Sequence, residues 1–474
     1  MSQKNVKVQS SNTKKNVLID GYWKWILLGV LLMFFYFHAS QYIEKDVWHD
    51  EAFQILYSQK DWSYIIGTND VHPPIFNMIA KLMVMVTPDI LSLRFKMLLI
   101  GLGFVTIFYL MVGYIFNNDV AFYSTALLVM SPTYAYYSVE FRSYMFVLML
   151  MVAQIYYFWV FYKKKEFNYN YFLLFSVTSL ICLWTHYYSI LILFSELCFL
   201  FFYDRDKFIH HGRILFPVFA LPFLLVIPYI ISQMGKIHSF WFKETHFINL
   251  ISTFFYLISF PTLEFSLFQL VVMILVLLGI VYGIIEKDER IIFFISLLLI
   301  PIISVFLFSK IFPFYHHRYF LFGGIGIFIF AGYFIYNLDL KLKKDLGLLI
   351  LGFVVIVFFI NLPLFTDALD IDLRDSSDFM KEYMVDKEDY VFIHESTFSQ
   401  SPYKVYIPDK KHYLLKNISR EELFTAGGSV VGDDEKINNL SIISGNYFYL
   451  TNTTRLKQKL IYSKGGLYIY EIEK

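Results

Sequence analysis

Long apolar runs alternate with short polar segments over the first three quarters of the chain. Because an α-helix needs about 20 mostly apolar residues to cross a bilayer, such runs predict membrane-spanning helices. We expect about eleven spans, at Trp23–Tyr42, Phe95–Phe116, Val120–Met130, Phe141–Tyr162, Tyr171–Trp184, Tyr187–Phe202, Leu215–Ile231, Leu267–Ile285, Ile291–Phe308, Tyr319–Tyr336 and Leu346–Leu364. Residues 1–22 form a polar tail, and its lysines predict that this tail is cytoplasmic.

The first loop, residues 43–73, then faces outward and contains a short amphipathic helix around 52–57, as expected at a membrane surface. Two further apolar pieces, near 74–88 and 248–260, are short. If Pro74–Val86 lies at the outer interface, the later basic loops fall on the cytoplasmic side, as the positive-inside rule requires. The alternative, a short helix crossing a thinned bilayer, stays open.

Composition changes sharply after Phe365. Residues 366–474 are polar and predict a small α+β domain, which an odd number of spans places outside the cell. Within it we expect a helix at Ser377–Met384 and strands at Tyr390–His394, Tyr403–Ile407, Tyr447–Leu450 and Leu467–Ile472. The predicted fold is an all-α polytopic bundle of about 11–13 hydrophobic helices over residues 23–365, followed by this small domain.

Composition supports a membrane protein. The 474 residues are 57% hydrophobic and only 17% charged, which is too apolar for a soluble chain of this length. The net charge of +1 gives no indication of nucleic-acid binding. The usage of Lys, Asn, Ile and Phe favours a bacterial source and hence the cell membrane.

The unusual polar residues gather at the predicted outer end of the bundle. They come from five segments that are far apart in sequence. Ionisable groups at membrane depth are costly, so they tend to be functional or paired. The group comprises Asp50, Glu51, His72, Glu140, Arg142, His186, the Tyr187-Tyr188 pair and the sequence His316-His317-Arg318-Tyr319.

Each member also has a purely structural explanation. Asp50 and Glu51 can favour the N-terminus of a following helix, and His72-Pro73-Pro74 can simply begin one. Glu140 and Arg142 can pair with each other. His186 and Tyr187 can belong to an interfacial aromatic belt, and the cations before Tyr319 can snorkel. A functional interpretation is also available for Arg318, because an arginine binds phosphate with a bidentate fork. The adjacent histidines do not indicate a zinc site, because no further ligands occur at a standard zinc spacing.

The order of these motifs resembles that of the GT-C glycosyltransferases. Similar features are the outward Asp50-Glu51, His72-Pro73-Pro74, Ser131-Pro132 with the stretch from Tyr137 to Tyr144, Thr185-His186-Tyr187, and His317-Arg318-Tyr319. The closest resemblance is to the bacterial branch of the protein mannosyltransferase superfamily (glycosyltransferase family 39-like), which includes the lipid A aminoarabinose transferases. It covers residues 20–365, whereas the last hundred residues match only in placement.

The resemblance implies a hexosyl or pentosyl transferase that moves a sugar from a polyprenyl-phosphate donor at the outer face, with inversion. Asp50 would be the base, with Glu51 beside it as a catalytic or orienting carboxylate. Arg318, Tyr319, His317 and Arg142 would bind the donor phosphate. The substrate would contact His49, His72, Glu140, Tyr144, His186 and Tyr187. If a divalent cation is used, as in some relatives, its ligands would be Asp50, Glu51 and His72.

The acceptor is left open between lipid, cell-wall glycan and protein. The chain lacks a visible repeat in its C-terminal domain, which puts a protein acceptor in doubt. Two other functions are alternatives. A flippase or transporter for lipid-linked sugars would place charges near the midplane and often contains repeats. A polysaccharide polymerase or ligase would need a long outer loop between late spans, where residues 231–267 supply one of moderate length.

Overall fold

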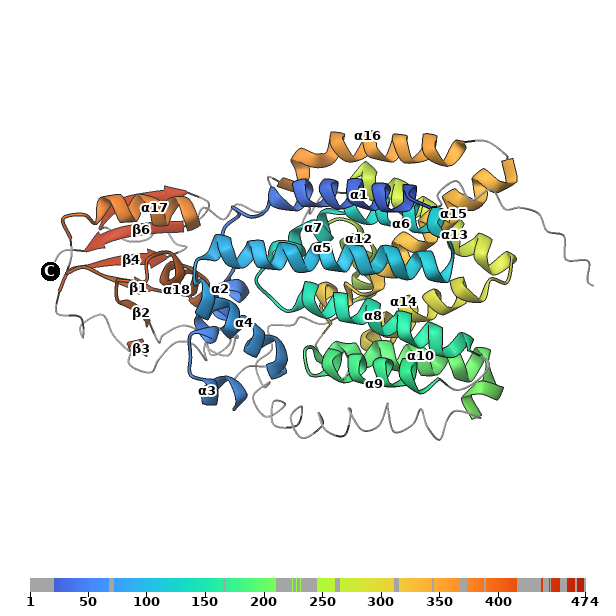
Figure 1. Cartoon of the computed structure of the whole chain (residues 1–474). Coiled ribbons are helices and arrows are strands. Elements are labelled where there is room, and N and C mark those ends of the chain that lie inside the picture. The colour runs from blue at the N-terminus through green and yellow to red at the C-terminus, as the bar shows by residue number, and fades with distance from the viewer. Residues whose placement is uncertain are drawn as a thin grey trace, which may run out of the picture.

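The computed structural model describes residues 21–67, 72–164, 168–209, 224, 227, 231, 245–260, 265–310, 315–342, 345–366, 373–387, 389–415, 436–437, 443, 445–451, 458–464 and 467–472. These residues form a helical bundle with a small sheet domain at one end (Figure 1). The predicted helical membrane bundle with a small C-terminal α+β domain is confirmed. Most of the expected span Leu215–Ile231 lies outside the described residues.

Seven described helices are long and apolar enough to cross a membrane. They are α1 (Trp23–Ser40), α5 (Ile90–Ile115), α8 (Tyr144–Lys163), α13 (Leu267–Ile285), α14 (Glu289–Phe308), α15 (Gly323–Leu342) and α16 (Leu346–Thr366). Many of their large apolar side chains are exposed, as on α16, where Leu349 is 70% and Ile360 68% exposed. In a soluble protein such a surface would associate, so it is the expected lipid-facing surface.

Shorter helices fill the space between the long ones. They are α6 (Asn118–Val129), α7 (Pro132–Val139), α9 (Tyr169–Leu183), α10 (Ile190–Tyr203) and α12 (Phe247–Ile258), with 3-10 turns η1 (Tyr187–Ser189) and η2 (His317–Phe320). The predicted span at 120–130 is α6, a helix of only 12 residues that is buried inside the bundle. At 1.5 Å per residue it is about 18 Å long, which is too short to cross the bilayer alone.

Close helix packing sets the centre of the bundle. Helix α15 contacts both α6 and α13. A Cβ atom on Gly279 of α13 would come within 2.0 Å of the Phe330 carbonyl oxygen on α15, so only glycine permits this approach.

Three helices lie at the end of the bundle that faces the sheet domain: α2 (His49–Ser58), α3 (Trp62–Ile66) and α4 (Pro74–Val86) (Figure 1). Helix α4 packs against α2 and α3. The sequence correctly predicts a helix around residues 52–57, but protein rather than solvent or lipid covers its apolar side chains. Phe53 and Tyr57 are fully buried, because α4 and α18 of the C-terminal domain cover α2.

The C-terminal domain contains a six-stranded mixed sheet in the order β3-β2-β1-β4-β6-β5. Strands β1, β2, β3 and β4 pair in parallel, and β6 joins β4 and β5 antiparallel. The strands are β1 (Val391–His394), β2 (His412–Leu415), β3 (Lys436–Ile437), β4 (Tyr447–Thr451), β5 (Lys459–Lys464) and β6 (Leu467–Ile472). Helices α17 (Leu373–Tyr383) and α18 (Thr397–Tyr406) accompany them.

One predicted strand of this domain is wrong. Residues 403–407 were expected to be extended, but Thr397–Tyr406 is helix α18. The parallel pairing of β1 with β2 needs a crossover connection, and α18 provides it. Tyr403 and Ile407, four residues apart, are both buried, as on one face of a helical turn.

Candidate active site

Asp50 lies in the first turn of α2, after Trp48, whose extended backbone begins the helix. Its Oδ2 atom accepts a hydrogen bond from Arg318 Nη1 at 2.6 Å, and the two side chains are 14% and 12% exposed. Arg318 belongs to η2, just before α15. Residues 268 positions apart therefore meet at the end of the bundle that faces the C-terminal domain.

The surrounding charges decide the protonation of Asp50. Burial alone would raise the pKa of this carboxyl group, but the positive charges of Arg318 and Arg142 act against burial and lower it. Asp50 is therefore a carboxylate at neutral pH. A basic group that is already ionised can hydrogen-bond a hydroxyl group and accept its proton.

A polar network fixes this end of α2. Arg142 Nη1 donates to the Asp50 carbonyl oxygen and to Gln54 Oε1, each at 3.3 Å. Gln54 Nε2 in turn donates to Asn77 Oδ1 at 3.0 Å. Asn77 lies in the first turn of α4, which starts at Pro74 as expected for a proline in a helical first turn. The His72-Pro73-Pro74 motif thus begins the helix that supports α2.

Arg318 also lines a pocket. Arg318, Tyr144 and His186 give it polar groups, while Val147, Leu148, Met151, Tyr188, Tyr319, Leu321 and Phe322 line the rest. The Tyr144 hydroxyl and His186 Nε2 are buried and have no hydrogen-bond partner among the described residues. Because buried polar atoms are normally paired, these two are well suited to a polar ligand.

Imidazole and phenol rings form one wall of this region. The His186 ring centroid lies 5.2 Å from that of His72 and 5.5 Å from that of Tyr319. Tyr188 and Tyr319 have centroids 4.6 Å apart. Burial, followed by the charges of Arg142 and Arg318, lowers the pKa of His72 to about 3 and that of His186 below its ordinary value. Both imidazoles are neutral at neutral pH and can exchange hydrogen bonds with hydroxyl groups.

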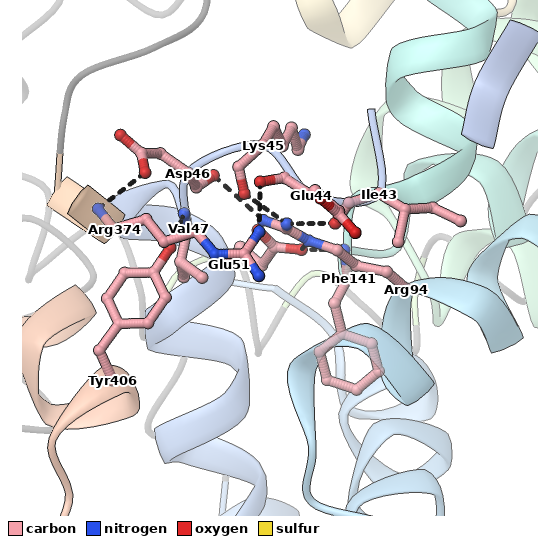
Figure 2. Close-up of polar contacts among 10 residues, drawn as sticks. All are labelled: Ile43, Glu44, Lys45, Asp46, Val47, Glu51, Arg94, Phe141, Arg374 and Tyr406. Carbon is pink, nitrogen blue, oxygen red and sulfur yellow. Dashed lines mark hydrogen bonds and ion pairs between the residues drawn. The ribbon is translucent and has the colours of Figure 1, made fainter. Parts of the chain in front are cut away.

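Glu51 points away from Asp50, as adjacent residues of a helix do. Its Oε1 accepts from Arg94 Nε at 2.9 Å and from the Phe141 amide at 3.0 Å, and its Oε2 lies 2.5 Å from Arg94 Nη2 (Figure 2). The ion pair is fully buried. Burial would raise the pKa of Glu51, but Arg94 lowers it. Both oxygens of the Glu51 carboxylate are therefore bonded within the protein.

Glu140 lies between α7 and α8 and is 2% exposed. Burial raises the pKa of its carboxyl group, and the positive charge of Lys45 acts in the opposite direction. Lys45 places its ammonium 3.3 Å from the centroid of the Tyr136 ring. The charges of Asp50 and Arg318 also act on Glu140, so this second carboxylate borders the same site.

The other expected site residues are placed as follows. His49 is buried beside Asp50 and adds to the positive potential there. His317 Nδ1 is hydrogen-bonded to Thr253 Oγ1 at 2.8 Å, and its ring lies against Tyr256, outside the pocket lining. Of the Tyr187-Tyr188 pair, Tyr188 lines the pocket, whereas Tyr187, the expected substrate contact, is not among the lining residues.

The suggested cation ligands are not brought together. Across the described ranges, no three His, Cys, Asp or Glu side chains form a group able to hold a metal ion. Glu51, one of the three candidates, has its carboxylate bound by Arg94 instead. These residues do not fit a metal site, and the proposed reaction involves no step at a metal ion.

Comparisons with known proteins identify the fold. Residues 71–231, about a third of the chain, match the family model of dolichyl-phosphate-mannose-protein mannosyltransferases. The structure is similar to that of ArnT from Cupriavidus metallidurans in the apo state, with a TM-score of 0.62 and 11% identity over 95% of this chain and 97% of that one. The chain has the GT-C fold. The resemblance inferred from the motifs and the expected enzyme class, a glycosyltransferase, are thereby confirmed.

Two other solved structures with this GT-C fold contain a lipid phosphate. ArnT bound to undecaprenyl phosphate aligns with a TM-score of 0.58 and 11% identity over 95% of this chain and 98% of that one. The archaeal oligosaccharyltransferase AglB from Archaeoglobus fulgidus, in complex with an inhibitory peptide and a dolichol-phosphate, aligns with a TM-score of 0.54 and 10% identity over 90% and 69%. A search of curated protein sequences gives no significant match.

Proposed function

We propose that this GT-C protein transfers a sugar from a polyprenyl-phosphate donor to a hydroxyl group of an acceptor, with Asp50 as the base and with inversion at the anomeric carbon. The observation that carries the proposal is the Asp50–Arg318 pair, whose arginine also lines a mostly apolar pocket. A base and a phosphate-binding cation, side by side next to an apolar wall, suit a reaction between a lipid phosphate and a hydroxyl group. The lipid phosphates bound by similar folds give further support.

The proposed reaction is a single displacement. The acceptor oxygen forms a bond to the anomeric carbon, while the bond from that carbon to the phosphate oxygen breaks. The acceptor proton passes to Asp50, and the electron pair of the broken bond leaves with the lipid phosphate. The charge on this leaving group grows in the transition state, where the guanidinium of Arg318 stabilises it. Arg142, which donates to the backbone carbonyl oxygen of Asp50, adds positive charge near the site.

Donor binding would make Asp50 a stronger base. Before binding, Arg318 lowers the pKa of Asp50, which makes this carboxylate a weak base. A donor phosphate at Arg318 brings negative charge and competes for the same guanidinium, so the pKa of Asp50 rises. Asp50 is therefore a stronger base when the donor is bound. Without the donor, Asp50 remains a weak base and accepts a proton less readily.

Different side chains around the pocket would bind different parts of the donor. The apolar side chains of α8, Val147, Leu148 and Met151, suit the first isoprene units of the lipid. Tyr144 and His186 offer hydrogen bonds to the phosphate or sugar. We place Glu140 on the acceptor side, because it borders Asp50 without lining the pocket.

We further propose that the active site faces outward and that the chain starts in the cytoplasm of a bacterial cell. Helix α8 runs from Tyr144 at the site to Lys163, and α15 runs from the site to Lys341. Basic residues therefore collect at the far end of the bundle, as the positive-inside rule requires of the cytoplasmic end. Labelling of a Lys381→Cys variant by an impermeant thiol reagent on intact cells tests this orientation, and protection of that residue would contradict it.

The test of function compares membranes that contain the wild type, Asp50→Asn or the control Asp375→Asn. Asp375 lies on the exposed surface of α17. The assay follows consumption of a radiolabelled undecaprenyl-phosphate sugar pool. We expect wild type and Asp375→Asn to consume the donor and Asp50→Asn to lose at least a hundredfold in rate, as is typical when a general base is removed. Equal consumption by all three would show that Asp50 is not the base. No consumption by the wild type would favour a flippase or a lipid-binding function.

A further inference from the structure

Residues Ile43–Val47 lie in the segment that connects α1 to α2, the helix that carries Asp50. We call them the pre-α2 loop. Arg94 of α5 holds this loop from the membrane side: it donates to the carbonyl oxygens of Ile43 at 2.7 Å, Lys45 at 2.6 Å and Asp46 at 3.0 Å (Figure 2). The same guanidinium pairs with Glu51, one position after Asp50.

The C-terminal domain holds the same loop from the other side. The Asp46 carboxylate accepts from the Arg374 amide at 2.8 Å (Figure 2). It also accepts from the Leu373 amide at 2.9 Å, and these two residues are the first of α17. Because amides at a helix N-terminus carry partial positive charge, a carboxylate is the favoured partner there. Arg374 Nη1 also donates to the Glu44 carbonyl oxygen at 2.7 Å.

A third contact comes from α18. The Tyr406 hydroxyl accepts a hydrogen bond from the Val47 amide at 2.9 Å, and α18 packs along α2. Each of the five residues of the pre-α2 loop thus has a backbone group bonded either to Arg94 or to the C-terminal domain. Val47 lies only three residues before Asp50.

We propose that the C-terminal domain positions the base: Tyr406 and Asp46 fix the pre-α2 loop and thereby hold the Asp50 carboxylate against Arg318. This inference rests on the proposed function, and it makes the domain a part of the catalytic machinery that never touches substrate. A displacement of about 1 Å at a reacting group can cost a hundredfold in rate, so small changes in the loop are expected to lower turnover.

The residues named here are positioning residues, and their loss should affect turnover more than lipid binding. The pocket that we assign to the donor is lined from α8, η1 and η2, and the pre-α2 loop does not contribute to it. Binding of undecaprenyl phosphate alone should therefore survive a change that misplaces Asp50. Simple unfolding of the domain would instead affect every property together.

Helix α18 supplies a matched pair of variants. Tyr406→Phe removes the hydroxyl that bonds Val47, whereas Tyr403→Phe removes a buried hydroxyl that bonds Ser376 Oγ at 2.7 Å inside the domain. Three measurements on the purified full-length protein are compared: donor turnover, binding of undecaprenyl phosphate, and hydrogen exchange of residues 43–51. For Tyr406→Phe we expect turnover at least tenfold lower, lipid-phosphate affinity within twofold of wild type and faster exchange at 43–51. For Tyr403→Phe we expect wild-type turnover and wild-type exchange in that segment.

A second pair tests the carboxylate. Asp46→Ala removes both acceptors for the α17 amides, while Asp46→Asn keeps one oxygen in place. Turnover should fall with alanine and recover in part with asparagine.

Several results would overturn the inference. Wild-type turnover by Tyr406→Phe despite faster exchange would show that the loop does not control the base. Equal losses for Tyr406→Phe and Tyr403→Phe would point to domain stability alone. If the wild type consumes no donor, the proposed function fails. The hydrogen-exchange data then test the positioning of the loop without the activity assay. Equal exchange at residues 43–51 in both tyrosine variants would refute positioning by the domain.

Discussion

Arg94 offers the sharpest test of how the active-site end is held together. Its guanidinium makes five hydrogen bonds, two to the Glu51 carboxylate and three to carbonyl oxygens of the pre-α2 loop. Arg94 is 1% and Glu51 0% exposed. The substitution Arg94→Met removes the charge and all five bonds while keeping an unbranched apolar stem. It leaves Glu51 as an uncompensated buried carboxylate.

The expected cost follows from that burial. Breaking a buried ion pair by removing one partner costs about 3–5 kcal/mol, because the remaining charge stays desolvated. Each carbonyl oxygen left without a donor costs about 1–3 kcal/mol unless water reaches it. We therefore expect Arg94→Met to lower the free energy of unfolding by at least about 3 kcal/mol. The double variant Arg94→Met/Glu51→Gln removes the buried charge as well, so it should be more stable than Arg94→Met alone.

The assay is denaturant unfolding of the purified protein in mixed micelles, followed by a fluorescence signal. Lys96→Met is the matched control: Lys96 lies two residues further along α5, is only partly buried, and donates to the Met83 carbonyl oxygen and to Thr87. We expect it to cost less than about 1.5 kcal/mol. The reasoning is refuted if Arg94→Met and Lys96→Met are equally destabilising, or if adding Glu51→Gln to Arg94→Met destabilises the protein further.

Four other outcomes are expected. Tyr144→Phe removes a pocket hydroxyl that has no hydrogen-bond partner among the described residues, so the free energy of unfolding should not change. A binding titration should show a loss of about 2–10-fold in affinity for undecaprenyl phosphate. Unchanged affinity would show that this hydroxyl does not contact the lipid phosphate. Glu140→Gln replaces a buried carboxyl group whose pKa is raised by burial, so unfolding at neutral pH should show equal or greater stability while sugar transfer falls. The pKa of Asp50 is lower in the folded protein than in the unfolded chain, so the ionised carboxylate stabilises the fold. This contribution is complete above the ordinary carboxyl pKa of about 4 and is lost as the pH falls toward the lower folded value. Between pH 5 and pH 3, the free energy of unfolding of Asp50→Asn should therefore fall less than that of wild type. Gly279→Ala places a Cβ 2.0 Å from a backbone oxygen of α15 and should lower the free energy of unfolding by more than about 1 kcal/mol. Gly352→Ala on α16 meets no atom within 4 Å and should leave the stability unchanged or raise it. Equal free energies of unfolding for the two variants would contradict the packing argument.

The parts of the fold that sequence could predict are those governed by local pattern. Lipid imposes a minimum length on apolar helices, so α1, α5 and α13 follow from run length alone. Strands β4 and β6 follow from their short apolar and aromatic runs. The order of polar motifs along the chain also indicated which segments converge, and Asp50 meets Arg318 in the structure.

Tertiary context decided the parts that pattern could not. The run around Tyr403 is rich in aromatic residues and has a strand-like composition, yet the parallel sheet requires a crossover there and makes it helical. The amphipathic pattern of α2 signals an interface, but whether that interface is lipid or protein depends on a domain more than 300 residues away. Arg94 was not singled out, because a basic residue at the start of an apolar run is expected as a flanking charge.

The Asp50-Glu51 pair shows why neighbouring carboxylates need not share a task. Successive side chains on a helix point about 100° apart, so α2 directs one carboxylate toward Arg318 and the other toward Arg94. Both have their pKa lowered by an arginine, but the pair with Arg94 is fully buried, while the pair with Arg318 stays partly accessible beside the pocket. A ligand phosphate can therefore compete for Arg318 and not for Arg94. In the proposed mechanism, Glu51 keeps its ion pair throughout the reaction, and this fixed anchor lets Asp50 exchange partners without moving.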